Sequence, residues 1–402
     1  MIVTSAMPQP GKRSLAPVSG FHDVAIVGAG PVGATLALAL ADADLDVVVL
    51  DARARGETLR GERSLALSHG ARLILERCGV WPMLAGVMEA VTPILAIDVS
   101  QAGGFGMTRL AAAEHSLPAL GYVVSYRALQ AALDAALAHA GIAVRHGVTA
   151  TSVGGTPAYA AVALEGADPV TARLAAVADG TGAAVAGVGR QRHDYGQVAL
   201  VAKLWRPVPH SGVAYERFTR DGPIALLPEG DHYGLVWTMT PGRAEEMLAL
   251  DDAAFVAALE RHFGARTGGF TRIKDRRSFP LMLEFARATV GTRCVVLGNA
   301  AQTLHPVAGQ GFNVGLRDAA GLAQAVLDSS REAIGSRAML EAYARSRRTD
   351  RWAGIAFTHG LVGVFGSDLP WLRWPRGLAL TLLDTLPVAK RAFTRAMMFG
   401  LR

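Results

Sequence analysis

A glycine-rich turn near the start of the chain constrains the fold more than any other feature. An apolar segment at residues 23–27 predicts a buried parallel strand, and the turn Gly28-x-Gly30-x-x-Gly33 follows it directly. An Ala/Leu-rich stretch to about Ala41 predicts a helix. Gly28 permits a tight turn, Gly30 lets the backbone approach a phosphate, and Gly33 allows the helix to pack closely on the strand. The pattern predicts a βαβ unit whose helix N-terminus faces a pyrophosphate.

An acidic residue at the end of the next predicted strand narrows the ligand to a dinucleotide. The strand at 47–50 ends at Asp51, eighteen residues after Gly33. A carboxylate at this place accepts hydrogen bonds from the ribose hydroxyls of adenosine. The first turn alone leaves both NAD and FAD open as the dinucleotide.

Two later motifs favour FAD. A predicted strand at 174–178 ends at Asp179-Gly180, and the glycine-rich segment 298–313 follows another apolar strand. Backbone N–H groups in such strand-to-helix loops can face a ligand. A simple NAD dehydrogenase does not need a second glycine-rich loop late in the chain, whereas a flavin extends far from the adenine site. The three motifs together therefore predict FAD.

The order of the motifs predicts an α/β chain (α+β overall) with a discontinuous, Rossmann-like FAD-binding domain. Alternating apolar residues between 195 and 240 indicate an inserted antiparallel-sheet substrate domain, and the end of the chain is expected to be helical. Three further helices are expected at 64–80, 244–263 and 315–328. The expected division is a flexible tail (1–20), FAD-binding parts at 21–100, 126–190 and 286–345, substrate-domain parts at 101–125 and 191–285, and a helical C-terminal region (346–402).

Composition excludes several classes of protein. The net charge is +6, mostly from arginine, but no helix-turn-helix, zinc spacing or aromatic-basic RNA motif appears, so neither a nucleic-acid partner nor a metal site is expected. Cys78 and Cys294 form no disulfide framework, which fits a reducing cytoplasm. No uncharged apolar run reaches the length of a transmembrane helix.

The three motifs resemble those of the p-hydroxybenzoate hydroxylase-like flavoprotein monooxygenases. The segments 298–318 and 214–228 are similar to those of the ubiquinone-biosynthesis hydroxylases that act on polyprenyl methoxyphenols. The resemblance implies a monooxygenase that uses FAD, NAD(P)H and O2, through a flavin C4a-hydroperoxide, to hydroxylate a polyprenyl phenol. The alternatives are a flavin-binding assembly subunit, partnered by other ubiquinone-biosynthesis proteins, and a related monooxygenase of another hydrophobic substrate.

The resemblance also implies a set of cofactor contacts. Two departures from the family accompany them: Asn299 replaces the usual Asp of the third motif, and Ala186 stands near the place of an Arg that often ends the second. An Asn still hydrogen-bonds a ribityl hydroxyl, so the site is expected to work. The implied cofactor-binding residues are Gly28, Gly30, Val32, Gly33, Asp51, Arg63, Arg127, Asp179, Gly180, Gly298, Asn299, Pro306, Gly309, Gly311, Phe312 and Asn313.

Catalytic and substrate-lining roles rest on fewer signals. His305 can move a phenolic proton or simply pack in its loop, and the packing role is favoured. Pro306 is expected to position the flavin ring. Tyr215 and Phe218 are candidates for the wall of a substrate pocket, although a role in the core of the sheet is favoured for both.

The C-terminal region offers a means of reaching a lipid substrate. Apolar residues from Trp371 to Leu383 are interleaved with Arg373 and Arg376, and Lys390, Arg391 and Arg395 follow. Such a segment can contact the inner face of the cytoplasmic membrane as a peripheral surface. Packing on the FAD domain or on a protein partner is the alternative.

Overall fold

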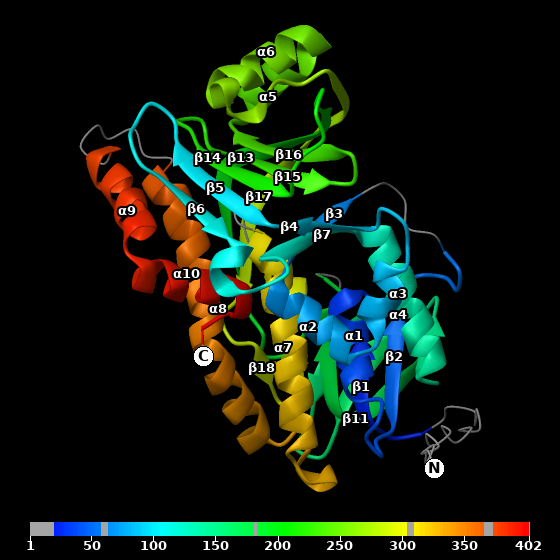
Figure 1. The fold of residues 1–402 in the computed structure, drawn as a ribbon. Coiled ribbons are helices and arrows are strands. Elements are labelled where there is room, and N and C mark those ends of the chain that lie inside the picture. Colours follow the sequence, from blue (N-terminus) through cyan, green and yellow to red (C-terminus); the bar gives the residue numbers. More distant parts are fainter. Residues whose placement is uncertain (1–19, 58–62, 181–182, 304–308, 366–372, 402) are drawn as a thin grey trace, which may run out of the picture.

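The computed structural model describes residues 20–57, 63–180, 183–303, 309–365 and 373–401. Two large sheets, joined by a small one, organise these residues (Figure 1). The first sheet has nine strands, with a parallel core in the order β19–β11–β1–β2–β8. The core strands are β1 (His22–Val27), β2 (Val47–Asp51), β8 (Ala143–His146), β11 (Ala167–Val177) and β19 (Cys294–Val296). The outer strands are β9 (Ala150–Gly155), β10 (Ala160–Leu164), β12 (Ala184–Val185) and β18 (Val290–Gly291).

Helices cover one face of this sheet. Apolar side chains from β1, β2, β11 and β19 pack there against α1 (Pro31–Ala39), α4 (Tyr126–His139) and α7 (Gln310–Leu327). The other face packs against side chains from β9 and β10. The sheet is therefore buried on both faces, as parallel sheets require, and its strand ends are the places left for a ligand.

The second sheet has eight strands, and its β14–β5 pair is the one parallel contact among its described pairs. One face packs on α5 (Pro241–Ala249) and α6 (Asp252–Phe263), which lie on the far side from the first sheet (Figure 1). The strand order is β20 (Gln302–Thr303), β17 (Arg272–Ala286), β13 (Arg190–Trp205), β16 (His232–Met239), β15 (Pro223–Glu229), β14 (Val213–Phe218), β5 (Ala96–Gln101) and β6 (Met107–Ala111).

A three-stranded sheet lies between the two large ones. Its order is β3 (Ser64–Ser68), β7 (Gly121–Ser125) and β4 (Val91–Ile94). The helices α2 (His69–Arg77) and α3 (Val80–Ala85) follow β3. Val123 and Ile94 of this sheet pack against Ala214 of β14, which connects it to the second large sheet.

Three helices complete the chain. They are α8 (Arg337–Phe365), α9 (Arg373–Thr385) and α10 (Pro387–Phe399), and α9 lies at the outer edge of the molecule beside β6 (Figure 1). Among the described helices, none combines the length and apolar character that crossing a bilayer requires.

The expected fold class is confirmed: the chain is α/β with a Rossmann-like parallel sheet and a second, mainly antiparallel sheet. Three expected helices need correction. Residues 64–68 are strand β3, because they pair with β7, and the helix begins only after Ser68, whose hydroxyl accepts from Ala71 N–H. The helix expected at 244–263 breaks at Leu250–Asp251, and α7 begins at Gln310 rather than near 315.

Candidate functional site

The first two glycine motifs meet at one edge of the parallel sheet. Gly28 has φ +97°, and a Cβ there would lie 2.8 Å from both the Ala178 carbonyl oxygen and the Asp179 Cα. The Ala178 N–H donates to the Val27 carbonyl oxygen at 2.8 Å. Only glycine fits where the end of β1 passes so close to the end of β11.

The third motif reaches the same edge. The Leu297 N–H donates to the Val177 carbonyl oxygen at 2.8 Å, so β19 ends beside β11. A Cβ on Gly298 or on Gly315 would lie 3.0 Å from Val32 Cγ2, which places the start of the third motif and α7 directly against α1. The strand ends that carry all three motifs therefore converge, as the sequence predicts for a single cofactor.

Two helix N-termini at this edge have no capping side chain. Gly30 is the N-cap of α1 and Gly309, at φ +58°, is the N-cap of α7. A Cβ at Gly30 would meet no atom within 4 Å, so the first turn of α1 opens onto free space. Free N–H groups and the positive end of a helix dipole bind phosphates. The site fits a pyrophosphate at α1 and an electron-rich ring edge at α7.

Asp51 lies at the end of β2, and its side chain is almost fully buried. Its Oδ2 accepts from the Ala29 N–H at 3.0 Å and pairs with the Arg53 guanidinium at 2.9 Å. Arg53 also donates to the Ala29 carbonyl oxygen at 3.3 Å. Arg53 is thus a cationic group at the place where the ribose and pyrophosphate of the cofactor are expected. No sequence motif marks this residue.

Gln130 of α4 is a second polar group at this end. Its Nε2 donates to the Ala29 carbonyl oxygen and to Asp134 Oδ1, both at 2.8 Å. Its Oε1 is buried and has no hydrogen-bond donor among the described residues. A ribose hydroxyl of a bound dinucleotide can satisfy this acceptor, so the residues present fit FAD. Gln130 lies on α4, five residues after the N-cap Ser125, and no sequence motif marks it.

The other predicted contacts of the first two motifs vary in exposure. Asp179 Oδ2 accepts from the Ala183 N–H at 2.7 Å. Gly180 has φ +87° and open space around its Cα. Arg63 and Arg127 are both exposed, and the Arg63 guanidinium lies 5.5 Å from the centre of the Tyr126 ring. The structure thus places Arg63 and Arg127 at the surface near the start of α4.

Asn313 fastens the third motif to the three-stranded sheet. Its Oδ1 accepts from the Ser68 N–H at 2.8 Å, and its Nδ2 donates to the carbonyl oxygens of Ala66 and Gly309 at 3.1 and 2.7 Å. Its side chain is therefore committed to holding the loop, and its part in cofactor binding is expected to run through the backbone. Phe312 and Gly311 are half-buried beside it. Asn299 is exposed at the strand end, and His305 and Pro306 lie outside the described residues.

The two candidate substrate-lining aromatics lie on opposite faces of the second sheet. Tyr215 packs edge-on against Tyr233 and Phe263, on the face that α6 covers. Phe218 is buried on the other face, because β14 alternates and Ala214 of that face packs on the three-stranded sheet. The structure therefore does not bring Tyr215 together with the cofactor motifs.

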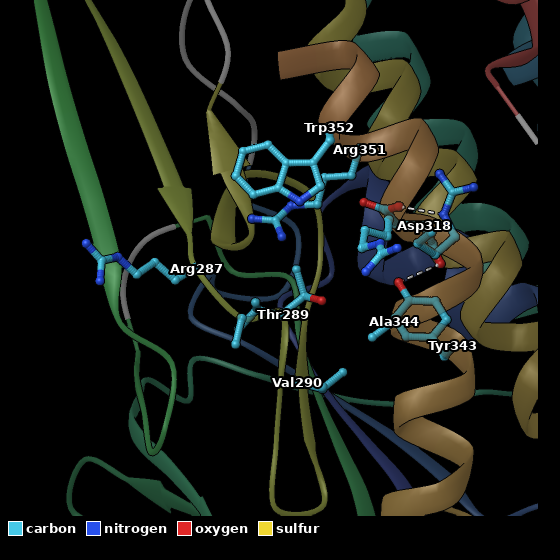
Figure 2. Close-up of a pocket in the computed structure, with 12 residues that line it drawn as sticks. Arg287, Thr289, Val290, Asp318, Tyr343, Ala344, Arg351 and Trp352 are labelled. Carbon is cyan, nitrogen blue, oxygen red and sulfur yellow. Dashed lines mark hydrogen bonds and ion pairs between the residues drawn. The ribbon is translucent and has the colours of Figure 1, made fainter. Parts of the chain in front are cut away.

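A pocket of about 170 Å³ lies between α8 and the β17–β18 turn (Figure 2). Arg351 lies beneath the Trp352 indole there and donates to Gln302 Oε1 at 2.9 Å and to the Ala286 carbonyl oxygen. Asp318 pairs with Arg347 at 2.8 Å. These contacts hold β17, β20 and α7 against α8.

Comparisons with known proteins agree with this geometry. The family model described as "FAD binding domain" matches residues 22–358. Ubiquinone hydroxylase UbiL of Rhodospirillum rubrum is 35% identical over 94% of this chain and 90% of its own length. The 3-demethoxyubiquinol 3-hydroxylase of Escherichia coli is 30% identical over 92% of this chain and 96% of its own length.

A solved structure shares the fold at low sequence identity. The p-nitrophenol 4-monooxygenase PnpA of Pseudomonas putida superposes with a TM-score of 0.74 at 16% identity, over 95% of this chain and 99% of its own. The family model spans most of the chain and all three glycine motifs. The chain therefore belongs to the FAD binding domain family, and FAD is its cofactor.

Proposed function

We propose that this FAD-dependent monooxygenase hydroxylates the aromatic ring of a polyprenyl phenol in ubiquinone biosynthesis, with NAD(P)H and O2 as co-substrates. The observation that carries the proposal is the near full-length similarity to two ubiquinone-pathway hydroxylases. The convergence of three glycine motifs at one sheet edge supports it, because a cofactor held there faces the second sheet.

Contacts at that edge link the cofactor site to the second sheet. Within the third motif, β20 pairs with β17, with Thr303 opposite Glu284. On the other side, the Ser64 hydroxyl of β3 donates to Glu229 of β15. Two strands of the second sheet, β17 and β15, thus contact the elements on either side of the cofactor edge. This arrangement supports a substrate position between the cofactor edge and the second sheet.

FAD supplies the redox chemistry that activates O2. The chain's own residues bind and orient the cofactor and shield it from water. The uncapped N-terminus of α1 at Gly30 would hold the pyrophosphate, and Asp51 would accept a hydrogen bond from the ribose. The N–H groups at the start of α7, near Gly311, would stabilise negative charge on the flavin ring. The second sheet, which β20 joins to the third motif, would limit the access of water to the ring.

The test is turnover of the FAD-loaded protein with a polyprenyl phenol in detergent micelles, isotope-labelled O2 and either NADH or NADPH. We expect a product that gains one labelled oxygen atom on the ring, measured by mass spectrometry. Consumption of NAD(P)H that yields only hydrogen peroxide would contradict the proposal and favour an assembly role with a bound flavin. A labelled product from a different hydrophobic substrate alone would assign the enzyme to another pathway.

A further inference from the structure

The outer face of α9 carries a row of exposed apolar side chains. Trp374, Leu378, Leu382 and Leu386 are 74, 52, 45 and 50% exposed. Trp374, Leu378 and Leu382 lie on α9 at intervals of four residues, which places them on one side of the helix, and Leu386 follows directly after α9 as the N-cap of α10. We call these four residues the α9 stripe. Large apolar side chains gathered in this way on a surface mark a contact site.

The opposite side of α9 already serves the fold. Leu380 is 7% exposed, and Gly377 packs so closely on the β5–β6 turn that a Cβ there would lie 2.6 Å from the Phe105 carbonyl oxygen. Asp384 accepts from the Thr108 hydroxyl at 3.2 Å and from the Arg109 N–H at 3.1 Å. The helix is thus anchored by one face, and the α9 stripe on the other face is not needed for that anchoring.

Neighbouring elements extend the apolar surface. The Phe105 ring lies 5.2 Å from the Trp374 ring, and Phe105 and Met107 are each 44% exposed. Val388, at the start of α10, is 83% exposed. The surface therefore runs from the β5–β6 turn along α9 to the beginning of α10, at the outer edge of the molecule (Figure 1).

Positive charge accompanies this surface. Arg391 and Arg395 are exposed one turn apart on α10, and among the described residues neither pairs with a carboxylate. Residues 373–402 contain six Lys or Arg residues but a single acid, Asp384. Asp384 and Glu114 are both engaged by Lys390, at 3.3 and 3.1 Å. The free charge beside the stripe is therefore cationic.

We propose that the α9 stripe and the adjacent arginines form a docking surface for an anionic lipid bilayer. Apolar and aromatic side chains enter the headgroup boundary, while Arg391 and Arg395 meet lipid phosphates. A protein partner would also cover apolar side chains, but the combination of an exposed Trp, aliphatic residues and unpaired arginines is the composition of an interfacial helix. The proposal goes beyond the reaction, and its test requires no turnover.

The experiment is co-sedimentation of the full-length, FAD-loaded protein with phosphatidylcholine vesicles, with and without phosphatidylglycerol. We expect binding to the anionic vesicles that weakens as salt rises. The combined variant Leu378→Gln, Leu382→Gln, Leu386→Gln should lower the binding constant at least about tenfold, because it removes the groups that enter the lipid. The combined variant Arg391→Gln, Arg395→Gln should bind less and lose most of the salt dependence.

Matched controls change similar residues elsewhere. Met88→Gln with Val208→Gln alters exposed apolar side chains away from α9, and Arg243→Gln with Arg337→Gln alters exposed arginines on α5 and α8. Both controls should bind vesicles as the unaltered protein does, and all variants should keep their flavin absorbance. Absence of vesicle binding at low salt, or undiminished binding by the leucine variant, would overturn the proposal. The proposal would also be overturned if light scattering showed an oligomer of the unaltered protein that the leucine variant dissociates, and if this dissociation alone explained the loss of vesicle binding.

Discussion

At the scale of single residues, two glycines of the first motif differ in what surrounds them. Gly30 has φ −63° and ψ 174°, a conformation open to any residue, and a Cβ there would meet nothing. A Cβ on Gly33 would overlap the Gly28 carbonyl oxygen. Gly30 therefore keeps space clear for a ligand, whereas Gly33 keeps space clear for the chain itself.

This difference predicts opposite outcomes for two substitutions. Gly30→Asp should fold but bind no flavin, because its carboxylate occupies and repels the pyrophosphate position. Gly33→Ala should lower stability by about 1–3 kcal/mol, the usual cost of overpacking. Flavin absorbance per protein and thermal melting of the apoproteins separate the two effects. A yellow, fully loaded Gly30→Asp protein would show that the first motif is not the cofactor site.

Glu216 is a half-buried residue of β14 whose Oε1 is shielded from solvent, and no sequence motif indicated it. Its Oε1 has no hydrogen-bond donor among the described residues, and burial raises its pKa from an ordinary 4.5 to about 8. Between these two pH values the folded protein retains a proton that the unfolded chain releases. Its contribution to the free energy of unfolding therefore falls as pH rises from 4.5 to 8.

Glu216→Gln should remove this pH dependence. The amide is neutral at every pH, so at pH 8 the variant should have a free energy of unfolding larger than that of the unaltered protein by on the order of a few kcal/mol, and it should melt at a higher temperature. At pH 5 the two proteins should differ little. Thermal melts in matched buffers measure this, and an equal shift at both pH values would mean that Glu216 ionises normally in the folded state.

At the scale of elements, a single capping residue divides what the apolar periodicity presents as one helix. Asp251 Oδ1 accepts from the Ala254 N–H at 2.7 Å, and Asp251 itself is extended, with ψ 169°. The cap lets α6 begin in a new direction, so that Phe255 and Leu259 reach the second sheet. Periodicity alone predicts one helix here because both pieces are apolar on one side.

Asp251→Ala should destabilise the protein by about 1 kcal/mol through loss of this cap. Urea unfolding measures the change, and Glu245→Gln on the exposed side of α5 is the matched control, expected to stay within about 0.5 kcal/mol. An equal loss in both variants would assign the effect to surface charge rather than to capping.

Elements with strong local signals were predictable, and those set by distant partners were not. β1, α1 and β2 follow from continuous apolar runs and a glycine turn. The antiparallel strands between residues 195 and 240 were predictable because their apolar alternation is plain. Residues 64–68 resemble a helix in composition, and only pairing with β7, more than fifty residues later, makes them a strand.

At the scale of the whole molecule, the Asp350 carboxylate connects three segments that are distant from one another in the chain. Asp350 of α8 pairs with Arg317 of α7 at 2.8 Å and with Arg347, and it accepts from the Leu401 N–H at 3.1 Å. Burial opposes ionisation of Asp350, but the two guanidinium groups outweigh burial and lower its pKa. The end of the chain is thereby fixed against the helix that opens from the cofactor loop.

Asp350→Asn should lower the melting temperature at neutral pH, because the largely buried Arg317 loses its counter-charge and Arg347 keeps only Asp318, at a cost of about 3–5 kcal/mol. The stability that Asp350 contributes is present above its unfolded pKa of 3.8 and disappears as pH falls through the lower folded value. The difference between the variant and the unaltered protein should therefore narrow below pH 3.8. Melts across that range test this, and a constant difference would contradict the lowered pKa.

The cofactor site was predictable as three separate motifs, and its supporting residues were not. The glycines and Asp51 stand in a recognisable order, so the sequence alone assigns them to one ligand. Arg53 and Gln130 belong to no motif, and their position beside Ala29 emerges only when β2 and α4 come together. Such groups cannot be recognised from the sequence, because residues that are far apart in the chain come together only in the folded structure.

The third motif belongs to both large sheets at once. It leaves the first sheet at the end of β19 and, as β20, adds a strand to the second. The second sheet cannot move away from the first without displacing the third motif, which would hold the flavin. This enzyme should therefore unfold in a single transition on heating. The loss of bound flavin and the loss of the β-sheet signal should have the same midpoint temperature.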